Sequence, residues 1–185
     1  MIDVLALDDG TILTIRPLER GDGSRLCELF ARLSPESRYR RFLSSKPEQT
    51  PGELAKLTHI DHVRQEALAA VDEADGSFVA EARYIELTDR PGVAELAMEV
   101  ADEFQKVGIG AALAGQLIER ARHGGMKTLV ATTLRENTPA RALMRRLGFR
   151  PVFSDGREIV LERSLDAELG SDPVEAAGPA VLPQR

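Results

Sequence analysis

Two amphipathic helix patterns, each preceded by a strand-like run, constrain the fold of this chain most strongly. Apolar residues recur every three or four positions over 109–121 and again over 140–147. Strand-like runs precede them at 93–100 and 127–132. Strands that alternate with helices in this way predict an α/β or α+β sheet domain.

The remaining elements follow from turn and proline signals. Strands are expected at 11–16, 66–71, 77–85, around 152 and at 159–161, and helices at 22–33, after Ser34-Pro35-Glu36 and at 52–57. The stretch 170–185 is rich in Gly, Ala and Pro and has little to bury, so we expect a disordered tail behind one domain, 1–169.

Composition excludes several classes of function. The chain of 185 residues has a net charge of −6, which disfavours a nucleic-acid binder. It has no apolar run long enough to span a membrane and no signal peptide. Cys27 is the only cysteine, so a disulfide scaffold or cysteine zinc cluster is excluded. We expect a cytoplasmic protein, and both a monomer and a dimer remain open.

The segment Gln105-Lys106-Val107-Gly108-Ile109-Gly110-Ala111 joins a strand to a helix. Glycines at such a junction let a ligand approach the backbone, and the N–H groups at a helix start attract anions. Neither a nucleoside-triphosphate loop nor the three-glycine dinucleotide fingerprint is present. A tight turn that binds nothing is the alternative.

Together with the segment Asn137-Thr138-Pro139-Ala140-Arg141-Ala142-Leu143 and the later Leu147-Gly148-Phe149, this loop resembles the GNAT superfamily of acyl-CoA-dependent N-acetyltransferases. The resemblance covers 11–163. It implies an α+β fold, an α/β/α sandwich with a mixed, mostly antiparallel sheet. Within the superfamily, 33–42 and 94–100 resemble the catalytic domain of bacterial Pat-type protein-lysine acetyltransferases, which acetylate acyl-CoA synthetases.

The resemblance also implies where acetyl-CoA binds. The pantetheine arm would lie beside the strand at Met98, Val100 and Ala101, and the pyrophosphate on the loop amides from Gln105 to Ala111, with Lys106 adding charge. Asn137 would contact the arm. Arg141 and Arg145 either reach the phosphates or remain in solvent.

Acyl transfer to lysine requires a neutral amine, and deprotonating a lysine of pKa about 10.4 at neutral pH costs roughly 4 kcal/mol, so a general base is useful. Strand alternation places Glu95 and Glu99 on one face of 94–100. Glu95 matches the position of the base in the related lysine acetyltransferases, and Glu99 is the second candidate. A surface carboxylate is the alternative for Glu95.

Many GNAT enzymes carry, seven residues after the asparagine, a tyrosine that protonates the leaving thiolate. This chain has Met144 there, which has no proton to give and fits either the coenzyme site or the apolar stripe of its helix. Pat-type domains generally lack the tyrosine too. Turnover is therefore expected, although a non-catalytic acyl-CoA sensor is an alternative, as is an acetyltransferase for small amines.

Other residues carry less weight. His59 and His62 have a spacing that suits metal ligands, but no third ligand is evident and we expect no metal. Cys27 is expected to be buried beside apolar neighbours. Charge is uneven: 72–103 holds ten acids against two bases, and 135–150 five bases against one acid. This distribution predicts a basic acceptor on one side and an anionic coenzyme on the other.

Overall fold

The computed structural model describes residues 3–43 and 50–166. Within these ranges one sheet has the strand order β1-β2-β3-β4-β5-β6-β8-β7. Its strands are β1 Asp3–Ala6, β2 Ile12–Pro17, β3 Gln65–Asp72, β4 Phe78–Glu86, β5 Val93–Val100, β6 Thr128–Leu134, β7 Arg150–Ser154 and β8 Glu158–Ser164. Neighbours are antiparallel except β5 and β6, which are parallel. The mixed, mostly antiparallel sheet expected from the sequence is confirmed.

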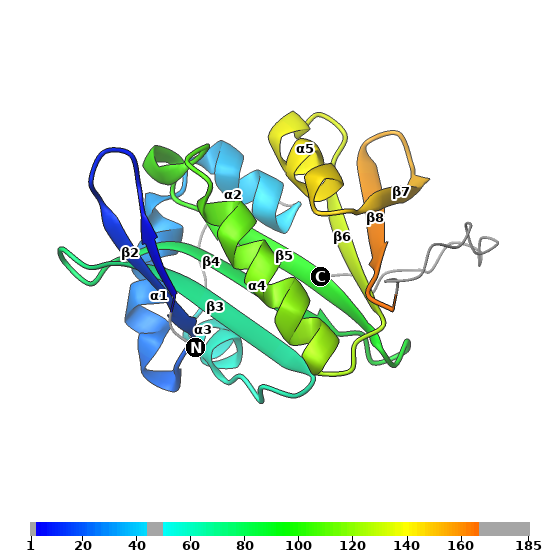
Figure 1. Ribbon diagram of the computed structural model, residues 1–185, viewed down its shortest axis with the longest axis horizontal. Helices are drawn as coiled ribbons and strands as arrows, with labels where there is room; N and C mark the ends of the chain where they lie inside the picture. The colour runs from blue at the N-terminus through cyan, green and yellow to red at the C-terminus, as the bar shows by residue number, and fades with distance from the viewer. Residues whose placement is uncertain (1–2, 44–49, 167–185) are drawn as a thin grey trace.

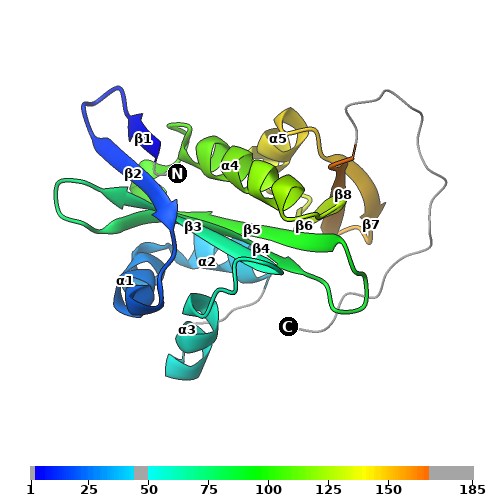
Figure 2. The ribbon, with the colours of Figure 1, turned by 60° about the horizontal axis from the view of Figure 1, so that its bottom comes forward.

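Helices cover both faces of the sheet (Figures 1 and 2). They are α1 Gly23–Arg32, α2 Pro35–Phe42, α3 Pro51–Thr58, α4 Ile109–His123 and α5 Thr138–Arg146. Figure 2 shows α4 and α5 on one face and α1, α2 and α3 on the other. Short 3-10 turns, Arg20–Asp22 and Asp102–Phe104, precede α1 and follow β5.

The larger core lies between the sheet and α4. The apolar stripe predicted for this helix is buried, with Leu113 and Leu117 fully inaccessible, and it packs over Leu96 of β5. Full burial of one leucine side chain stabilises the fold by about 1.5–3 kcal/mol. Gly108 and Gly124 cap the two ends of this helix, as the glycine positions indicate.

A second core forms on the opposite face. Leu26, Leu29 and Phe30 of α1 are buried against Ala67 and Ala69 of β3. These alanines show that β3 is covered on both sides, because its neighbours Leu68 and Ala70 belong to the core under α4. The sheet is therefore a central layer, and α2 is held over the face of β5 that carries the two glutamates.

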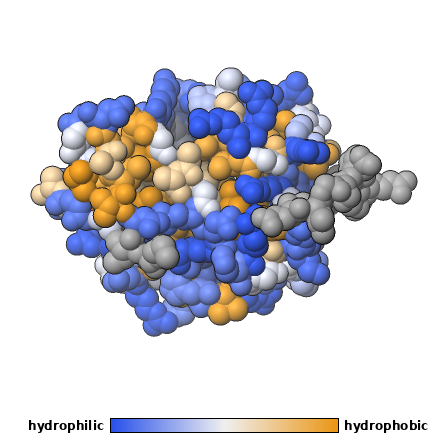
Figure 3. All heavy atoms as spheres, in the orientation of Figure 1, coloured by the Kyte–Doolittle hydropathy of each residue, from blue (hydrophilic) through white to orange (hydrophobic). Residues whose placement is uncertain are grey.

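Several exposed apolar side chains lie on the strands at the two edges of the sheet. Val4 and Ile12 are exposed on β1 and β2, and Val152 and Phe153 on β7. Figure 3 shows apolar residues gathered at the β1–β2 end of the face it presents. Among the described residues, no helix is both long and apolar enough to cross a bilayer.

The structure differs from the sequence-based expectations at β1 and at Cys27. Strand β1 was not predicted, since its four residues are few and form an edge strand with alternating partial exposure. The expectation that Cys27 is buried was wrong, because Cys27 lies on the exposed side of α1, next to the buried Leu26. The predicted tail, 170–185, lies outside the described residues.

Candidate active site

The parallel strands β5 and β6 separate halfway along their length. They pair only at Val93 with Thr128, Ala94 with Leu129 and Glu95 with Val130. Both strands continue beyond this point, and Figure 1 shows them diverging. The second half of β5 therefore keeps its ladder with β4 but presents an edge that β6 does not cover.

A groove of about 360 Å³ opens where the strands part. Its lining comes from α2, the end of β5, the loop before α4, the first turn of α4 and one side of α5. Met98, Glu99 and Val100 contribute from β5, and Leu143 from α5. Of the positions proposed from the sequence, these also line it: Gln105, Lys106, Gly108, Gly110, Ala111 and Asn137.

The loop at the start of α4 presents backbone donors. Lys106 and Gly108 have positive φ values of 68° and 97°, which turn the chain sharply into the helix. The N–H groups of residues 107–110 donate no hydrogen bond to any described residue. Because α4 has 15 residues, its dipole adds partial positive charge at the same place. This end of the groove is suited to an anion.

Gly110 lies on the floor of the groove. A Cβ atom here would lie 3.4 Å from Leu143 Cδ2, 3.6 Å from Met98 Sδ and 3.9 Å from Val100 Cγ2. A larger side chain at this position would therefore enter the space between β5 and α5. Gly108 differs, because its constraint is the φ of 97° and its Cβ would meet no atom within 4 Å.

Gln105 fixes the loop to the strand and to α2. Its side-chain Nε2 donates to Val100 O at 3.1 Å, Asp102 Oδ1 at 3.0 Å and Ser37 Oγ at 3.2 Å. Asp102 also accepts from Ser34 N at 2.6 Å and from the Ser37 hydroxyl. The side chain of Gln105 therefore has a structural role, since it holds the loop against β5 and α2. Sequence reasoning did not identify Asp102 or Ser37.

Of the basic residues predicted for the site, Lys106 is the one that lines the groove. Arg40 and Arg146 line it together with Lys106. Arg141 and Arg145 are exposed and do not line it, and Arg141 Nη1 donates to Arg135 O at 2.8 Å. The signal for Arg146 was present, since it follows Leu143 by three residues and so shares a helix face with it.

Several proposed coenzyme contacts lie away from the groove. Met144 is 5% exposed and belongs to the core, which is the packing alternative. Ala101 and Ile109 are buried, and Val107 is 49% exposed beside the groove lining. Asn137 does line the groove, but it is mostly buried and its side chain caps α5, accepting from Ala140 N at 3.3 Å.

Glu95 and Glu99 share one face of β5, as the alternation predicts. Glu99 lines the groove, is 5% exposed and accepts a hydrogen bond from Arg41 Nε. Glu95 is partly exposed, at the point where β5 leaves β6, and its charge acts on Arg41. The structure thus brings Glu99 into the groove and places Glu95 on the same face nearby.

Burial raises the pKa of Glu99 to about 8. Arg41 and Arg83 act against this rise, whereas the charge of Glu81 and a hydrogen bond with Glu81 add to it. Burial by itself lowers the pKa of Arg41, but the surrounding carboxylates raise this pKa above its ordinary value. Arg41 is therefore charged, and it lies beside a Glu99 whose pKa is well above that of an ordinary carboxyl group.

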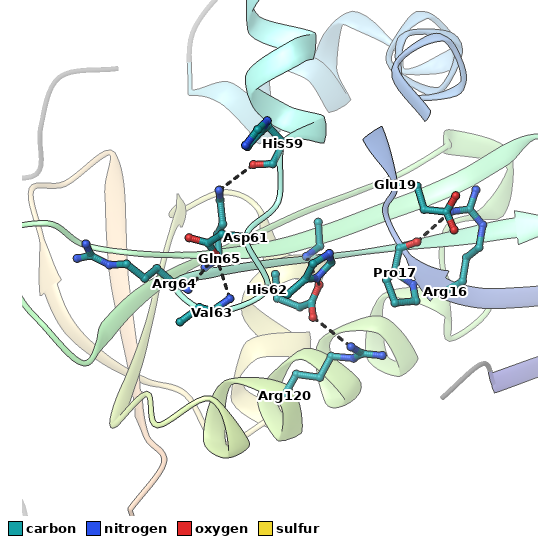
Figure 4. A network of polar contacts seen from close by, with 12 residues as sticks. Arg16, Pro17, Glu19, His59, Asp61, His62, Val63, Arg64, Gln65 and Arg120 are labelled. Carbon is teal, nitrogen blue, oxygen red and sulfur yellow. Dashed lines mark hydrogen bonds and ion pairs between the residues drawn. The ribbon is translucent and has the colours of Figure 1, made fainter. Parts of the chain in front are cut away.

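The two histidines considered as metal ligands separate to different partners. His59 Nε2 lies 3.3 Å from Arg20 Nη2, while His62 Nδ1 lies 2.9 Å from Glu66 Oε1. Figure 4 shows His59 and His62 around the turn that leads into β3, with Arg120 reaching up from α4. Within the ranges that the structure describes, no group of three or more His, Cys, Asp or Glu side chains could hold a metal ion.

Known proteins resemble this chain in sequence and in fold. The profile of the acetyltransferase (GNAT) family matches residues 24–149. Acetyltransferase PA5475 of Pseudomonas aeruginosa is 35% identical over 148 residues, which is 79% of each chain. The chain belongs to the GNAT acetyltransferase family. As a GNAT enzyme it is an N-acetyltransferase, and acetyl-CoA is the acyl donor.

Two further relatives of this GNAT domain are Pat proteins. Acetyltransferase Pat of Mycolicibacterium smegmatis is 33% identical over 134 residues. The aligned region covers 72% of this chain and 40% of that protein. The crystal structure of the GNAT domain of S. lividans PAT superposes with a TM-score of 0.80 at 28% identity, covering 88% of this chain and 96% of that chain.

Proposed function

We propose that this GNAT domain transfers acetyl from acetyl-CoA to the side-chain amine of a lysine on a protein. The likeness to two Pat proteins supports a protein acceptor. An acyl-CoA synthetase is one candidate for this acceptor. The carboxylate of Glu95 on the face of β5 below α2 supports a cationic acceptor on that side.

The observation that carries the proposal is the groove between β5 and α5. The uncovered edge of β5 at Met98–Val100 can pair with the amides of a pantetheine arm as a further strand would. The N–H groups of residues 107–110 suit the pyrophosphate, and Lys106, Arg40 and Arg146 supply positive charge around it. The residues present therefore fit acetyl-CoA.

Glu95 is the proposed general base. It would take the proton of the attacking amine. Without a base, the amine is protonated at neutral pH, and removing that proton costs about 4 kcal/mol. Backbone N–H groups of β5 would polarise the carbonyl under attack. Bound acetyl-CoA supplies an activated acyl group, and the chain's own residues orient it and move the proton.

The experiment that tests the acceptor is a measurement of thiol release from acetyl-CoA. We expect release with lysine-bearing proteins, including an acyl-CoA synthetase, at a kcat/KM well above that for polyamines or aminoglycosides. Faster release with small amines would replace the protein acceptor by a small one. Coenzyme binding without release on any acceptor would make the domain an acyl-CoA sensor.

A further inference from the structure

Behind the groove, two glutamates face each other across the β4–β5 ladder. Glu81 and Glu99 are register partners, and their side chains lie on the sheet face below α2. Glu81 is fully buried and Glu99 is 5% exposed. Like charges at directly opposed positions are destabilising, and burial away from water increases that cost. Two ionised carboxylates in this position therefore require compensation.

The surrounding donors compensate only in part. Arg41 Nε donates to Glu99 Oε2, and Arg83 Nη1 donates to Leu57 O at 3.0 Å. Arg83 Nη2 lies 2.6 Å from Glu81 Oε1, but without the alignment of a hydrogen bond. Within the described residues, both carboxyl oxygens of Glu81 and Oε1 of Glu99 have no donor.

One proton shared between Glu99 and Glu81 satisfies two of these three oxygens. A protonated Glu99 becomes a donor to Glu81, and the facing carboxylates become an acid–carboxylate pair. The pKa of Glu99, raised to about 8 by burial, agrees with this count of donors. The charged groups around the pair are Arg41 from α2, Arg83 from β4 and Glu95 further along the same face of β5.

An acid in this groove would speed the reaction by protonating the leaving sulfur, an effect that is typically about 10²- to 10⁴-fold. The tyrosine that often protonates the leaving sulfur is replaced by Met144, whose side chain lies in the core. Among the described groove residues, Glu99 is the one carboxyl group, and no Tyr, His or Cys joins it. An acid of pKa about 8 is well matched to a thiol of pKa about 8.5.

We propose that Glu99, holding a proton shared with Glu81, is the general acid that protonates the sulfur leaving the acetyl group. The proposal rests on the proposed acetyl transfer. As the carbon–nitrogen bond forms and the carbon–sulfur bond breaks, Glu99 gives its proton to the sulfur and Glu95 takes one from the amine. A proton then returns from Glu95 to Glu99 through solvent, so the sum is amine plus thioester giving amide plus thiol.

Changing the leaving group tests Glu99 directly. Glu99→Gln keeps an oxygen for Arg41 and an N–H donor for Glu81 but has no proton to transfer. We expect its kcat to fall about 100-fold with acetyl-CoA. With the selenoester analogue of acetyl-CoA, whose selenol is a much stronger acid and leaves without protonation, we expect a fall of less than about threefold.

Glu95→Gln is the matched control. Its base acts on the amine, so its loss should lower kcat by the same factor with the thioester and with the selenoester. An equal fall for Glu99→Gln with the thioester and the selenoester would overturn the proposal. A wild-type protein that releases no thiol with any amine would instead contradict the acetyl transfer itself.

Infrared spectroscopy of the coenzyme-free protein gives an independent result. We expect the wild-type minus Glu99→Gln difference spectrum to show a protonated-carboxyl stretch at pH 7 that disappears near pH 8. In Glu81→Gln, the pKa of Glu99 should fall, because the neighbouring negative charge is gone and both arginines remain. The stretch should then be absent at pH 7.

Glu81 is a positioning residue in this scheme, since it acts through Glu99. The alkaline limb of the rate profile should move to lower pH in Glu81→Gln, a change that a purely structural role would not cause. A wild-type spectrum without a protonated carboxyl at pH 7 would overturn the shared proton, whether or not the domain is active.

Discussion

Glu95 and Glu99 illustrate how two like residues on one strand face acquire different chemistry. Strand alternation predicts their shared face. Their difference comes from Arg41 and Glu81, which are distant in the sequence and meet Glu99 only after α2 and β4 pack against β5. The sequence therefore identified both carboxylates, whereas the buried pair behind Glu99 required the structure.

The proposed base can be tested by its pH dependence. Glu95→Gln should lower kcat/KM for a lysine acceptor at pH 7 by about 10²-fold or more. The deficit should shrink as the pH rises toward the pKa of the amine, about 10.4, because the acceptor then loses its proton without help. Steady-state rates from pH 7 to 9.5 give the comparison.

Glu119→Gln is the control for this change, since it alters an exposed acid on α4 in the same way. Its profile should match the wild type. Unaltered kinetics of Glu95→Gln at pH 7 would remove Glu95 from the mechanism.

The raised pKa of Glu99 also predicts a pH-dependent stability. The folded pKa of about 8 lies above the ordinary value of 4.5. The stability contributed by the protonated group is therefore complete below about pH 4.5 and is lost as the pH rises through about 8. Glu99→Gln removes this dependence, so its free energy of unfolding should improve relative to the wild type between pH 5 and 8. Urea titrations at several pH values measure it, and a constant difference would contradict the raised pKa.

At the scale of elements, α2 and the coenzyme loop are fastened together by one carboxylate. Asp102 accepts from the backbone N–H and hydroxyl groups at the start of α2 and from Gln105. Desolvation raises the pKa of Asp102, but the hydrogen bonds from Ser37, Ser34 and Gln105 together hold it below its ordinary value. The groove therefore depends on a contact between segments that are far apart in the chain.

Replacing this carboxylate should loosen the groove. Asp102→Asn should reduce the free energy of unfolding by about 1–2 kcal/mol, because charge-assisted hydrogen bonds become weaker neutral ones. We expect the KM for acetyl-CoA to rise severalfold with a smaller change in kcat, measured with a saturating acceptor. Asp89→Asn, in the exposed β4–β5 turn, should leave both constants unchanged. An unaltered KM in Asp102→Asn would show that this contact does not hold the groove.

The positions of the helices could be predicted from the sequence better than the direction in which their polar side chains face. The apolar stripes of α4 and α5 correctly placed both helices, because burial dominates their periodicity. Which arginines of α5 reach the groove depends on a rotation of a few tens of degrees about the helix axis. Arg146 lines the groove while Arg145 does not, and the packing of Leu143 and Met144 against the rest of the domain sets that rotation.

For the molecule as a whole, the uneven charge acquires a more limited meaning. Four of the ten acids in 72–103 lie on β4 and β5, and several of the ten are paired or buried: Glu86 pairs with Arg64 and Glu103 with Arg32, while Glu99 is buried against Arg41. The charge that remains for steering is smaller than the count of ten acids against two bases suggests.

A modest salt effect is therefore expected. Raising the ionic strength from about 0.01 to 0.15 M shortens the screening length from about 30 to 8 Å. The kcat/KM for a lysine peptide with basic neighbours should fall by about threefold, while kcat at saturation stays constant. Steady-state rates at four salt concentrations provide the measurement. A rate that rises with salt would contradict an acidic approach for the acceptor.

The central claim is that acetyl transfer occurs in the groove between β5 and α5. Gly110→Glu would place bulk and negative charge on its floor, whereas Gly115→Glu puts the same side chain on α4 where a Cβ meets no atom within 4 Å. Mass spectrometry of a lysine-bearing acceptor after incubation with acetyl-CoA compares the two. The account predicts acetylated lysine with the wild type and Gly115→Glu and none with Gly110→Glu. Acetylation by Gly110→Glu at the wild-type rate would contradict it.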